Sequence, residues 1–155
     1  MQEGKLYIPM NQNVVILLAE DNSGHAKLIK KHLKRSGITN TIVHFKNGSE
    51  LIDHLKRDNE EKTNLEEGQQ FVAIMDLKMP VLDGQDTLKL LKNDGKFSVI
   101  PIIILSTSDD PKEIHQCYQL GCNGYVVKPV ISEDFTDFVK NLVSYFKIIQ
   151  IPIIK

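Results

Sequence analysis

Cysteine is scarce in this sequence. Cys117 and Cys122 are the only two cysteines among 155 residues, which is too few for a disulfide framework. Their spacing falls outside the usual CxxC pairs, and because structural zinc normally needs four convergent ligands, a zinc site that adds His115 is disfavoured. We expect Cys122 to be a small core residue and Cys117 to occupy an ordinary helix position.

Long apolar runs and an excess of positive charge are also missing. No stretch approaches the roughly 20 apolar residues of a membrane span, and the N-terminus lacks the pattern of a signal peptide, so we expect a cytoplasmic protein without membrane contact. The 19 Lys and Arg residues are balanced by 20 Asp and Glu residues, which argues against nucleic-acid binding. The motif GxxxxGK[ST] is absent, which excludes a P-loop enzyme.

The composition that is present is that of one globular domain. Hydrophobic residues make up 41% and charged residues 25% of the chain, close to the average of soluble globular proteins. The length suffices for one hydrophobic core and is too short for two ordinary domains. We expect a domain over residues 13–147, preceded by a lead-in at residues 1–12 and followed by an apolar tail at residues 148–155.

Short apolar runs alternate along the chain with segments in which apolar residues recur at helical spacing. The predicted strands cover residues 14–19, 41–45, 71–75, 99–105 and 125–127, and a helix follows each of them. Ser23 is expected to cap the first helix, and the polar stretch 57–70 is expected to form a solvated loop or a helix extension. Five β-then-α units predict an α/β fold with a parallel sheet covered on both faces. At this length the natural candidate is the flavodoxin-like (βα)5 doubly wound sheet with strand order 2-1-3-4-5.

Polar side chains follow four of the five predicted strands at the point where each strand ends. They are Glu20 and Asp21, Asp76, Ser106 and Thr107, and Lys128, in chain order. Each of them alone has an ordinary explanation as a helix cap or turn residue. Because ligands of an open parallel sheet bind beyond the carboxyl ends of the strands, their coincidence at these ends favours one shared site.

The residue types at these strand ends suit phosphoryl transfer. Three converging carboxylates repel one another, and burial raises that cost unless a cation lies among them. Mg2+ prefers oxygen ligands and keeps some of its waters, so two or three carboxylates, a backbone carbonyl and a phosphate can bind it. One carboxylate can then attack a phosphoryl group while the ion and a lysine neutralise the charge on the phosphoryl oxygens.

Four motifs give the sequence a resemblance to the receiver domain of two-component response regulators. They are LAEDN from Leu18, DLKMPVLDG from Asp76, LSTS from Leu105 and YVVKP from Tyr125. The second motif matches the family's DxxMPxxDG stretch at every marked position, and the resemblance covers roughly residues 13–147. It supports the flavodoxin-like strand order and implies a protein that accepts a phosphoryl group.

The resemblance also implies a role for each matching acid and for the lysine. Asp76 would be the phosphoacceptor, and Lys128 would pair with the phosphoryl group. Mg2+ (or Mn2+) would be held by carboxylates and by one backbone carbonyl, from Glu20, Asp21, Asp76 and Lys78. The family further implies a cis peptide bond between Lys128 and Pro129.

The resemblance assigns a conformational switch to the fourth and fifth strands. Ser106 would donate a hydrogen bond to the phosphoryl group, and Tyr125 would turn inward as Ser106 moves. We prefer Ser106 to its neighbour Thr107 because it comes first after the apolar strand. An equally ordinary interpretation of Tyr125 is a half-buried strand residue with an exposed hydroxyl.

Two departures from the family pattern point to a subgroup. The interval from Asp21 to Asp76 is longer than usual, and the surplus lies in the polar stretch after the second helix. Together with the missing output domain and the apolar C-terminus, this resembles the single-domain regulators that serve bacterial and cyanobacterial phytochrome histidine kinases. The implied partner is therefore a sensor histidine kinase, with a bacteriophytochrome as the candidate within that class.

We also expect a homodimer. The face made by the fourth helix, the fifth strand and the last helix is where phosphorylation would change the surface, and Tyr145, Phe146 and residues 148–154 would extend it with apolar groups. Of three alternative functions, the first below remains open and the other two are disfavoured. A phosphorelay intermediate would use the same residues, a non-phosphorylated interaction module would lack the acceptor or lysine, and a flavodoxin-like cofactor binder would need a first turn less acidic than Glu20-Asp21-Asn22.

Overall fold

The computed structural model describes residues 13–61, 70–129, 132–148 and 151–152, so the expected lead-in at residues 1–12 lies outside the described residues. Strands and helices alternate along the chain as predicted. The strands are β1 (Val14–Ala19), β2 (Ile42–Phe45), β3 (Gln70–Asp76), β4 (Ile102–Ser106) and β5 (Gly124–Val127). The helices are α1 (Ser23–Arg35), α2 (Gly48–Glu61), α3 (Gly84–Asn93), the 3-10 turn η1 (Phe97–Val99), α4 (Pro111–Leu120) and α5 (Ser132–Ile148).

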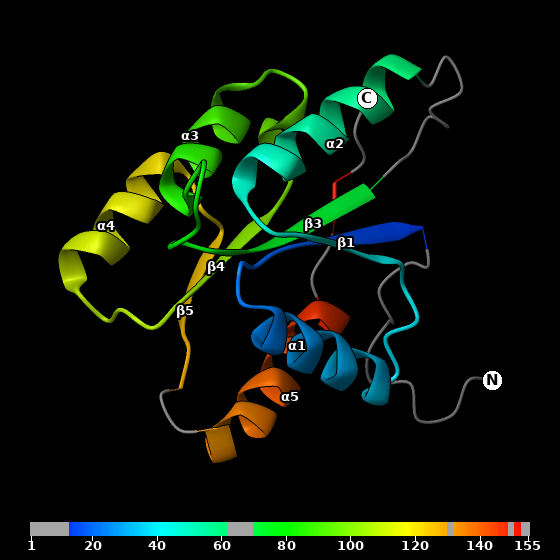
Figure 1. Cartoon of the computed structure of the whole chain (residues 1–155), viewed down its shortest axis with the longest axis vertical. Helices are drawn as coiled ribbons and strands as arrows, with labels where there is room; N and C mark the ends of the chain where they lie inside the picture. The colour runs from blue at the N-terminus through cyan, green and yellow to red at the C-terminus, as the bar shows by residue number, and fades with distance from the viewer. Residues whose placement is uncertain (1–12, 62–69, 130–131, 149–150, 153–155) are drawn as a thin grey trace.

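The five strands form one sheet in the order β2-β1-β3-β4-β5, and every neighbouring pair is parallel. This confirms the predicted flavodoxin-like doubly wound fold and its strand order. Helices α1 and α5 lie on one side of the sheet, and α2, α3 and α4 lie on the other (Figure 1).

Each face of the sheet contributes to its own hydrophobic core. Leu17 and Ala73 pack with the α2–α3–α4 side, whereas their neighbours Ile16 and Val72 pack with the α1–α5 side, and all four are fully buried. Successive side chains of a strand point to opposite faces, so a sheet covered on both sides needs apolar residues at every position. This is why β1 and residues 71–75 of β3 are unbroken apolar runs.

Helix starts are set by side chains that accept a backbone N–H. Asn22 accepts from His25 at 3.1 Å and is the N-cap of α1, so the expectation that Ser23 caps this helix is wrong by one residue. Asp83 caps α3 in the same way, and Asp110 caps α4 just before a proline at the first helical position. These caps fix where the loops from the carboxyl ends of the strands turn into helices.

The structure corrects the start of one strand and decides two further details that the sequence left general. The fourth strand begins at Ile102 instead of residue 99, because residues 97–99 form the turn η1 and Pro101 has no N–H for the sheet. Helix α2 continues to Glu61, so part of the polar stretch 57–70 is a helix extension, and residues 62–69 lie outside the described residues. Cys117 occupies a position in helix α4, as expected, and its side chain is fully buried in the same core as Cys122.

The C-terminal segment packs against its own domain at Ile151. The carbonyl of Ile151 accepts a 2.7 Å hydrogen bond from the side chain of Gln70, at the start of β3, and its side chain packs against the α1–α5 core. At this residue the tail therefore does not extend the face of α4, β5 and α5, contrary to the expectation. Residues 149–150 and 153–155 of the predicted tail lie outside the described residues.

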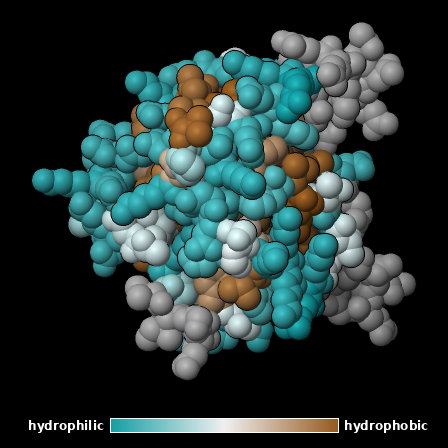
Figure 2. Space-filling model, in the orientation of Figure 1, coloured by the Kyte–Doolittle hydropathy of each residue, from teal (hydrophilic) through white to brown (hydrophobic). Residues whose placement is uncertain are grey.

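The visible surface is mostly hydrophilic and carries small separate hydrophobic patches (Figure 2). Within the described part of the chain, none of the helices combines the length and apolar character that a membrane crossing requires.

Candidate functional site: an acidic pocket at the carboxyl edge of the sheet

The sheet register brings the predicted site residues to one edge. Ala19 at the end of β1 pairs with Met75 at the end of β3, and Asp76 pairs with Leu105. Ser106 ends β4 and pairs with the last residue of β5. The predicted acids, the two hydroxyl candidates and Lys128 lie at or just beyond these strand ends, whereas Tyr125 is the second residue of β5. Side chains that are far apart in the sequence therefore meet at one edge of the sheet.

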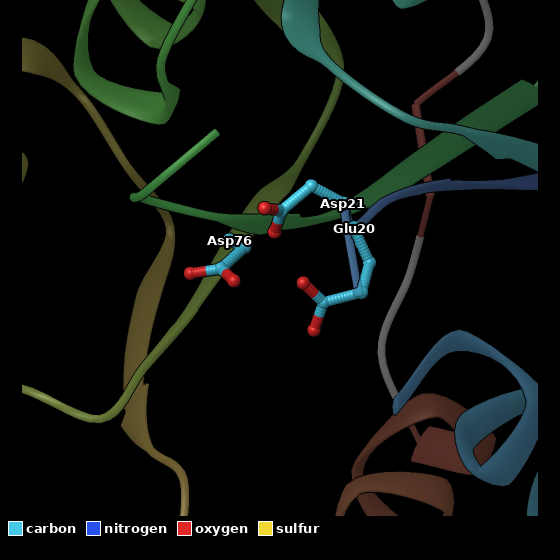
Figure 3. A group of neighbouring side chains, drawn as sticks. All are labelled: Glu20, Asp21 and Asp76. Carbon is cyan, nitrogen blue, oxygen red and sulfur yellow. The ribbon is translucent and has the colours of Figure 1, made fainter. Parts of the chain in front are cut away.

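Three carboxylates converge in this pocket. Glu20 and Asp21 follow β1 and Asp76 ends β3, and Figure 3 shows their side chains side by side. One oxygen from each lies within 4.8 Å of the other two. Glu20 is buried, Asp76 is partly buried and Asp21 is exposed, so the cluster extends from the protein interior to its surface.

The buried carboxylate of Glu20 is in an unfavourable position for a negative charge. Burial and a hydrogen bond with Asp76 raise the pKa of Glu20 from 4.5 to about 7, and the nearby Lys128 partly offsets this rise. Its Oε2 atom is buried and has no hydrogen-bond partner. A hard divalent cation among three carboxylates would remove both costs, so the donor set fits Mg2+ or Mn2+.

Lys128 supplies the positive charge that faces the acids. Its Nζ atom contacts Glu20 Oε1 and lies 3.3 Å from Asp76 Oδ2, and the residue is only 3% exposed. Its backbone N–H donates to Ser106 at 2.7 Å. The part of the chain that the structure describes contains no cis peptide bond, so the expected cis bond before Pro129 is wrong, and the pairing of β5 with β4 directs the lysine instead.

The loop after β3 is held close to the phosphoacceptor candidate. The N–H of Lys78 donates to Asp76 Oδ1 at 3.3 Å, and the N–H of Gly84 donates to Leu77 at 2.8 Å. Gly84 packs so closely that an added Cβ would lie 2.3 Å from the carbonyl oxygen of Asp76. Val81, at the tip, has a positive φ of 65° and is 84% exposed, a strained backbone for a β-branched residue.

The structure places the two hydroxyl candidates, Ser106 and Thr107, in different environments. Ser106 is buried at the end of β4, and its hydroxyl accepts from the N–H of Ser108 at 3.1 Å, whereas Thr107 is exposed. The Tyr125 hydroxyl donates to the carbonyl of Ser108 at 2.8 Å, and burial raises the pKa of this phenol. The tyrosine ring is therefore bound to the loop that begins at Ser106 rather than presenting a free hydroxyl.

Two histidines next to Glu20 had no place in the sequence-based site. His44, on β2, binds the carbonyl of Glu20 through Nε2 at 2.8 Å, although the second strand was expected to contribute nothing. His25, on α1, lies with Nδ1 3.5 Å from Glu20 Oε1 and stacks on Phe135 of α5. The only sequence signal for His44 was a polar residue one position before the end of a short strand.

A groove lies on the face formed by α4, β5 and α5. Its cavity volume is about 340 Å3, and its walls include Tyr118 from α4, Tyr125 from β5, and Phe138 and Tyr145 from α5. Tyr118 is 51% exposed and Tyr145 is 40% exposed. Tyr125 thus links the groove to the loop that follows Ser106.

A comparison with known protein families identifies the chain. The model of the response regulator receiver domain matches residues 16–140. The protein belongs to this family. The match spans the three acids, Ser106 and Lys128, so the sequence resemblance is confirmed at the level of the family.

Solved structures of receiver domains resemble this chain along nearly its whole length. A response regulator receiver domain from Rhodospirillum rubrum is 35% identical, with a TM-score of 0.83 over 91% of this chain and 99% of the other. The Mn2+-bound form of Rcp1, a response regulator of Synechocystis, is 25% identical, with a TM-score of 0.77 over 89% and 98%. The phosphorylated cyanobacterial phytochrome response regulator RcpA is 27% identical, with a TM-score of 0.77 over 89% and 97%. These neighbours are consistent with the phytochrome-associated subgroup that the sequence suggested.

Proposed function

We propose that this protein is a response regulator receiver that accepts a phosphoryl group on Asp76 in a Mg2+-dependent reaction. The observation that carries the proposal is the convergence of Glu20, Asp21 and Asp76 within 4.8 Å with the buried Lys128 facing them. Asp76 is the proposed acceptor because it contacts Lys128, belongs to the acidic cluster and, unlike the buried Glu20, remains partly accessible. The relationship to phosphorylated RcpA and Mn2+-bound Rcp1 supports this assignment.

The transfer itself needs little covalent chemistry from the protein. An oxygen of the Asp76 carboxylate forms a bond to phosphorus as the bond from phosphorus to the donor breaks, and the donor leaves with the electron pair of that bond. Mg2+, when bound, neutralises charge on the phosphoryl oxygens and restrains their orientation. Lys128 pairs with the same oxygens, and the Ser106 hydroxyl turns from Ser108 to donate a hydrogen bond to one of them. Water later cleaves the acyl phosphate and restores the carboxylate.

The phosphoryl donor is the phosphohistidine of a sensor histidine kinase, and the exchange takes place in the cytoplasm. Within that class we favour a bacteriophytochrome, because Rcp1 and RcpA are structural neighbours and RcpA is a phytochrome response regulator. A small donor such as acetyl phosphate uses the same acceptor oxygen. Two alternatives differ from this proposal in the fate of the phosphoryl group. A phosphorelay intermediate would pass it from Asp76 to a further protein, and a non-phosphorylated interaction module would never receive it.

The signal leaves through a changed interaction surface. Phosphorylation adds about two negative charges at the end of β3, and the movement of Ser106 alters the loop that holds the Tyr125 hydroxyl. Tyr125 also lines the groove between α4 and α5. We propose that two copies of the chain associate through this face and that phosphorylation changes their association.

Labelling with a phosphodonor tests the proposed acceptor. The protein is incubated with Mg2+ and acetyl phosphate, and the acid-stable mass increase of the intact chain is measured. We expect a single phosphoryl group on the wild-type protein, none on Asp76→Asn, and wild-type labelling of the matched control Asp137→Asn, an exposed aspartate on α5. Equal labelling of Asp76→Asn would disprove the assignment, and an unlabelled wild-type protein would favour the interaction module.

A further inference from the structure

Both backbone polar groups of Glu20, its N–H and its carbonyl, form hydrogen bonds with residues of the edge strand β2. Its N–H donates to the carbonyl of Phe45 at 2.9 Å, and its own carbonyl is bound by His44 Nε2 at 2.8 Å. The first bond is a regular rung of the parallel ladder between β1 and β2. The second is made by a side chain, so β2 reaches past its own end to the peptide that joins Glu20 to Asp21.

The geometry of a parallel ladder explains why a side chain is needed at this point. Where the N–H of Glu20 binds Phe45, a continuing ladder would supply the N–H of residue 47 to the carbonyl of Glu20. Asn47 instead starts the turn into α2, and its side chain accepts the N–H of Glu50 at 2.9 Å as a cap. His44 therefore supplies a donor where the chain of β2 has already turned away.

We propose that His44 is a positioning residue of the metal site, which orients the Glu20–Asp21 peptide so that both carboxylates face one ion. This inference rests on the proposed function, since it assigns to β2 a part in Mg2+ binding. The side chain of Glu20 is buried and that of Asp21 is exposed, and one oxygen of each lies within 4.8 Å of the other. Rotation of the peptide between them would move the two carboxylates apart, so the hydrogen bond to this carbonyl acts on both ligands at once.

The direction of the hydrogen bond is defined by its acceptor. A carbonyl oxygen only accepts, so Nε2 of His44 must carry the proton, and the ring donates in its neutral form as well as its charged form. The interaction therefore requires no charge on His44. A glutamine at this position would place an amide N–H near the same point, whereas a phenylalanine would keep the ring and remove the donor.

The test compares His44→Phe, His44→Gln and the matched control His115→Ala, which removes an exposed histidine of α4. Mg2+ binding to each folded protein is measured by calorimetry, and the free energy of unfolding is measured separately without metal. Because one hydrogen bond changes binding by about a factor of three to ten, we expect His44→Phe to weaken Mg2+ binding by about that factor. His44→Gln and His115→Ala are expected to bind Mg2+ within about twofold of the wild-type protein.

A purely structural role for His44 would lower stability and leave the Mg2+ affinity of the folded protein unchanged, and that result would overturn the inference. Nitrogen NMR of the wild-type imidazole ring is a second, independent test. A neutral His44 ring protonated at Nδ1 would overturn the inference even if His44→Phe failed to fold. A wild-type protein that bound no Mg2+ would count against the proposed function instead, and the ring tautomer would still report on the contact with Glu20.

Discussion

The side chains of Lys128 and Asp76 meet across the carboxyl edge of the sheet, with Nζ 3.3 Å from Oδ2. The same Nζ contacts Glu20, so one buried cation serves two acids that are also the expected metal ligands. A metal ion bound as proposed would therefore compete with the lysine for the Glu20 carboxylate, and a phosphoryl group on Asp76 would bring additional negative charge for the lysine to bind.

Replacement of Lys128 by methionine is expected to separate metal binding from phosphoryl transfer. Without the competing ammonium group, the acids should bind Mg2+ more tightly, by roughly tenfold. Phosphorylation by acetyl phosphate should nevertheless slow by about a hundredfold, as for the loss of one charge-stabilising donor. Calorimetry and single-turnover labelling give the two quantities, and a parallel loss of both would show that Lys128 mainly maintains the fold.

Metal binding is expected to weaken in acid because of Glu20. Its pKa is raised to about 7 by burial and by Asp76, and Mg2+ binds only the ionised form. Below pH 7 the affinity should fall by up to tenfold per pH unit, with release of close to one proton per ion bound. Titrations in buffers of different ionisation enthalpy measure that proton, and Glu20→Gln should abolish its release.

The raised pKa of Glu20 also affects the stability of the metal-free protein. The folded state binds the Glu20 proton more tightly than the unfolded chain, in which the pKa is near 4.5. The resulting stabilisation is fully present below the unfolded value and is lost as the pH rises through about 7. Saturating Mg2+ should remove this loss, which denaturant unfolding at pH 5 and pH 8 with and without the ion would reveal.

The sequence was sufficient to predict that the three acids and the lysine lie close together, because the fold itself brings their strand ends to one edge. Apolar runs that end in Glu20, Asp76 or Lys128 are visible without a structure, and parallel strands end at a common edge. The resemblance to receiver domains then ordered the strands. Site residues defined by where a strand stops are accessible to sequence analysis in this fold.

Contacts that depend on the register between strands were not accessible in the same way. His44 reaches Glu20 because the chain turns into α2 at Asn47, whose N–H would otherwise continue the ladder, and periodicity gives no sign of that. The start of β4 was also placed too early, because Val99 and Ile100 satisfy the apolar pattern of a strand although Val99 is the last residue of η1. Ile151 was assigned to an exposed face, yet its carbonyl binds Gln70.

Gly84 is expected to be irreplaceable where the loop after β3 returns to the phosphoacceptor. A Cβ at this position would lie 2.3 Å from the carbonyl oxygen of Asp76 and 2.7 Å from Cα of Leu77, both of which are backbone atoms that cannot rotate away. Gly84→Ala should lower the free energy of unfolding by about 2 kcal/mol or more and weaken Mg2+ binding.

Gly95 provides the matched control, since a Cβ added there has nothing within 4 Å. Gly95→Ala should leave Mg2+ affinity unchanged and stability equal or slightly raised, because alanine reduces the freedom of the unfolded chain. Denaturant unfolding of both variants checks the pair. A tolerated Gly84→Ala would mean that the loop can retreat from Asp76 at little cost.

Association through the groove is expected to depend on its α5 wall. Asn141 is exposed on α5 and lines the groove together with Tyr118 and Tyr145. An arginine at this position would place two like charges at the centre of a symmetric interface, which brings the same surface of both copies together. Asn141→Arg should therefore be monomeric at concentrations at which the wild-type protein dimerises, whereas Ser144→Arg, on the same helix but outside the groove, should dimerise normally. Sedimentation equilibrium with and without beryllofluoride measures both variants, and a dimer of Asn141→Arg as tight as the wild-type dimer would place the interface on another face.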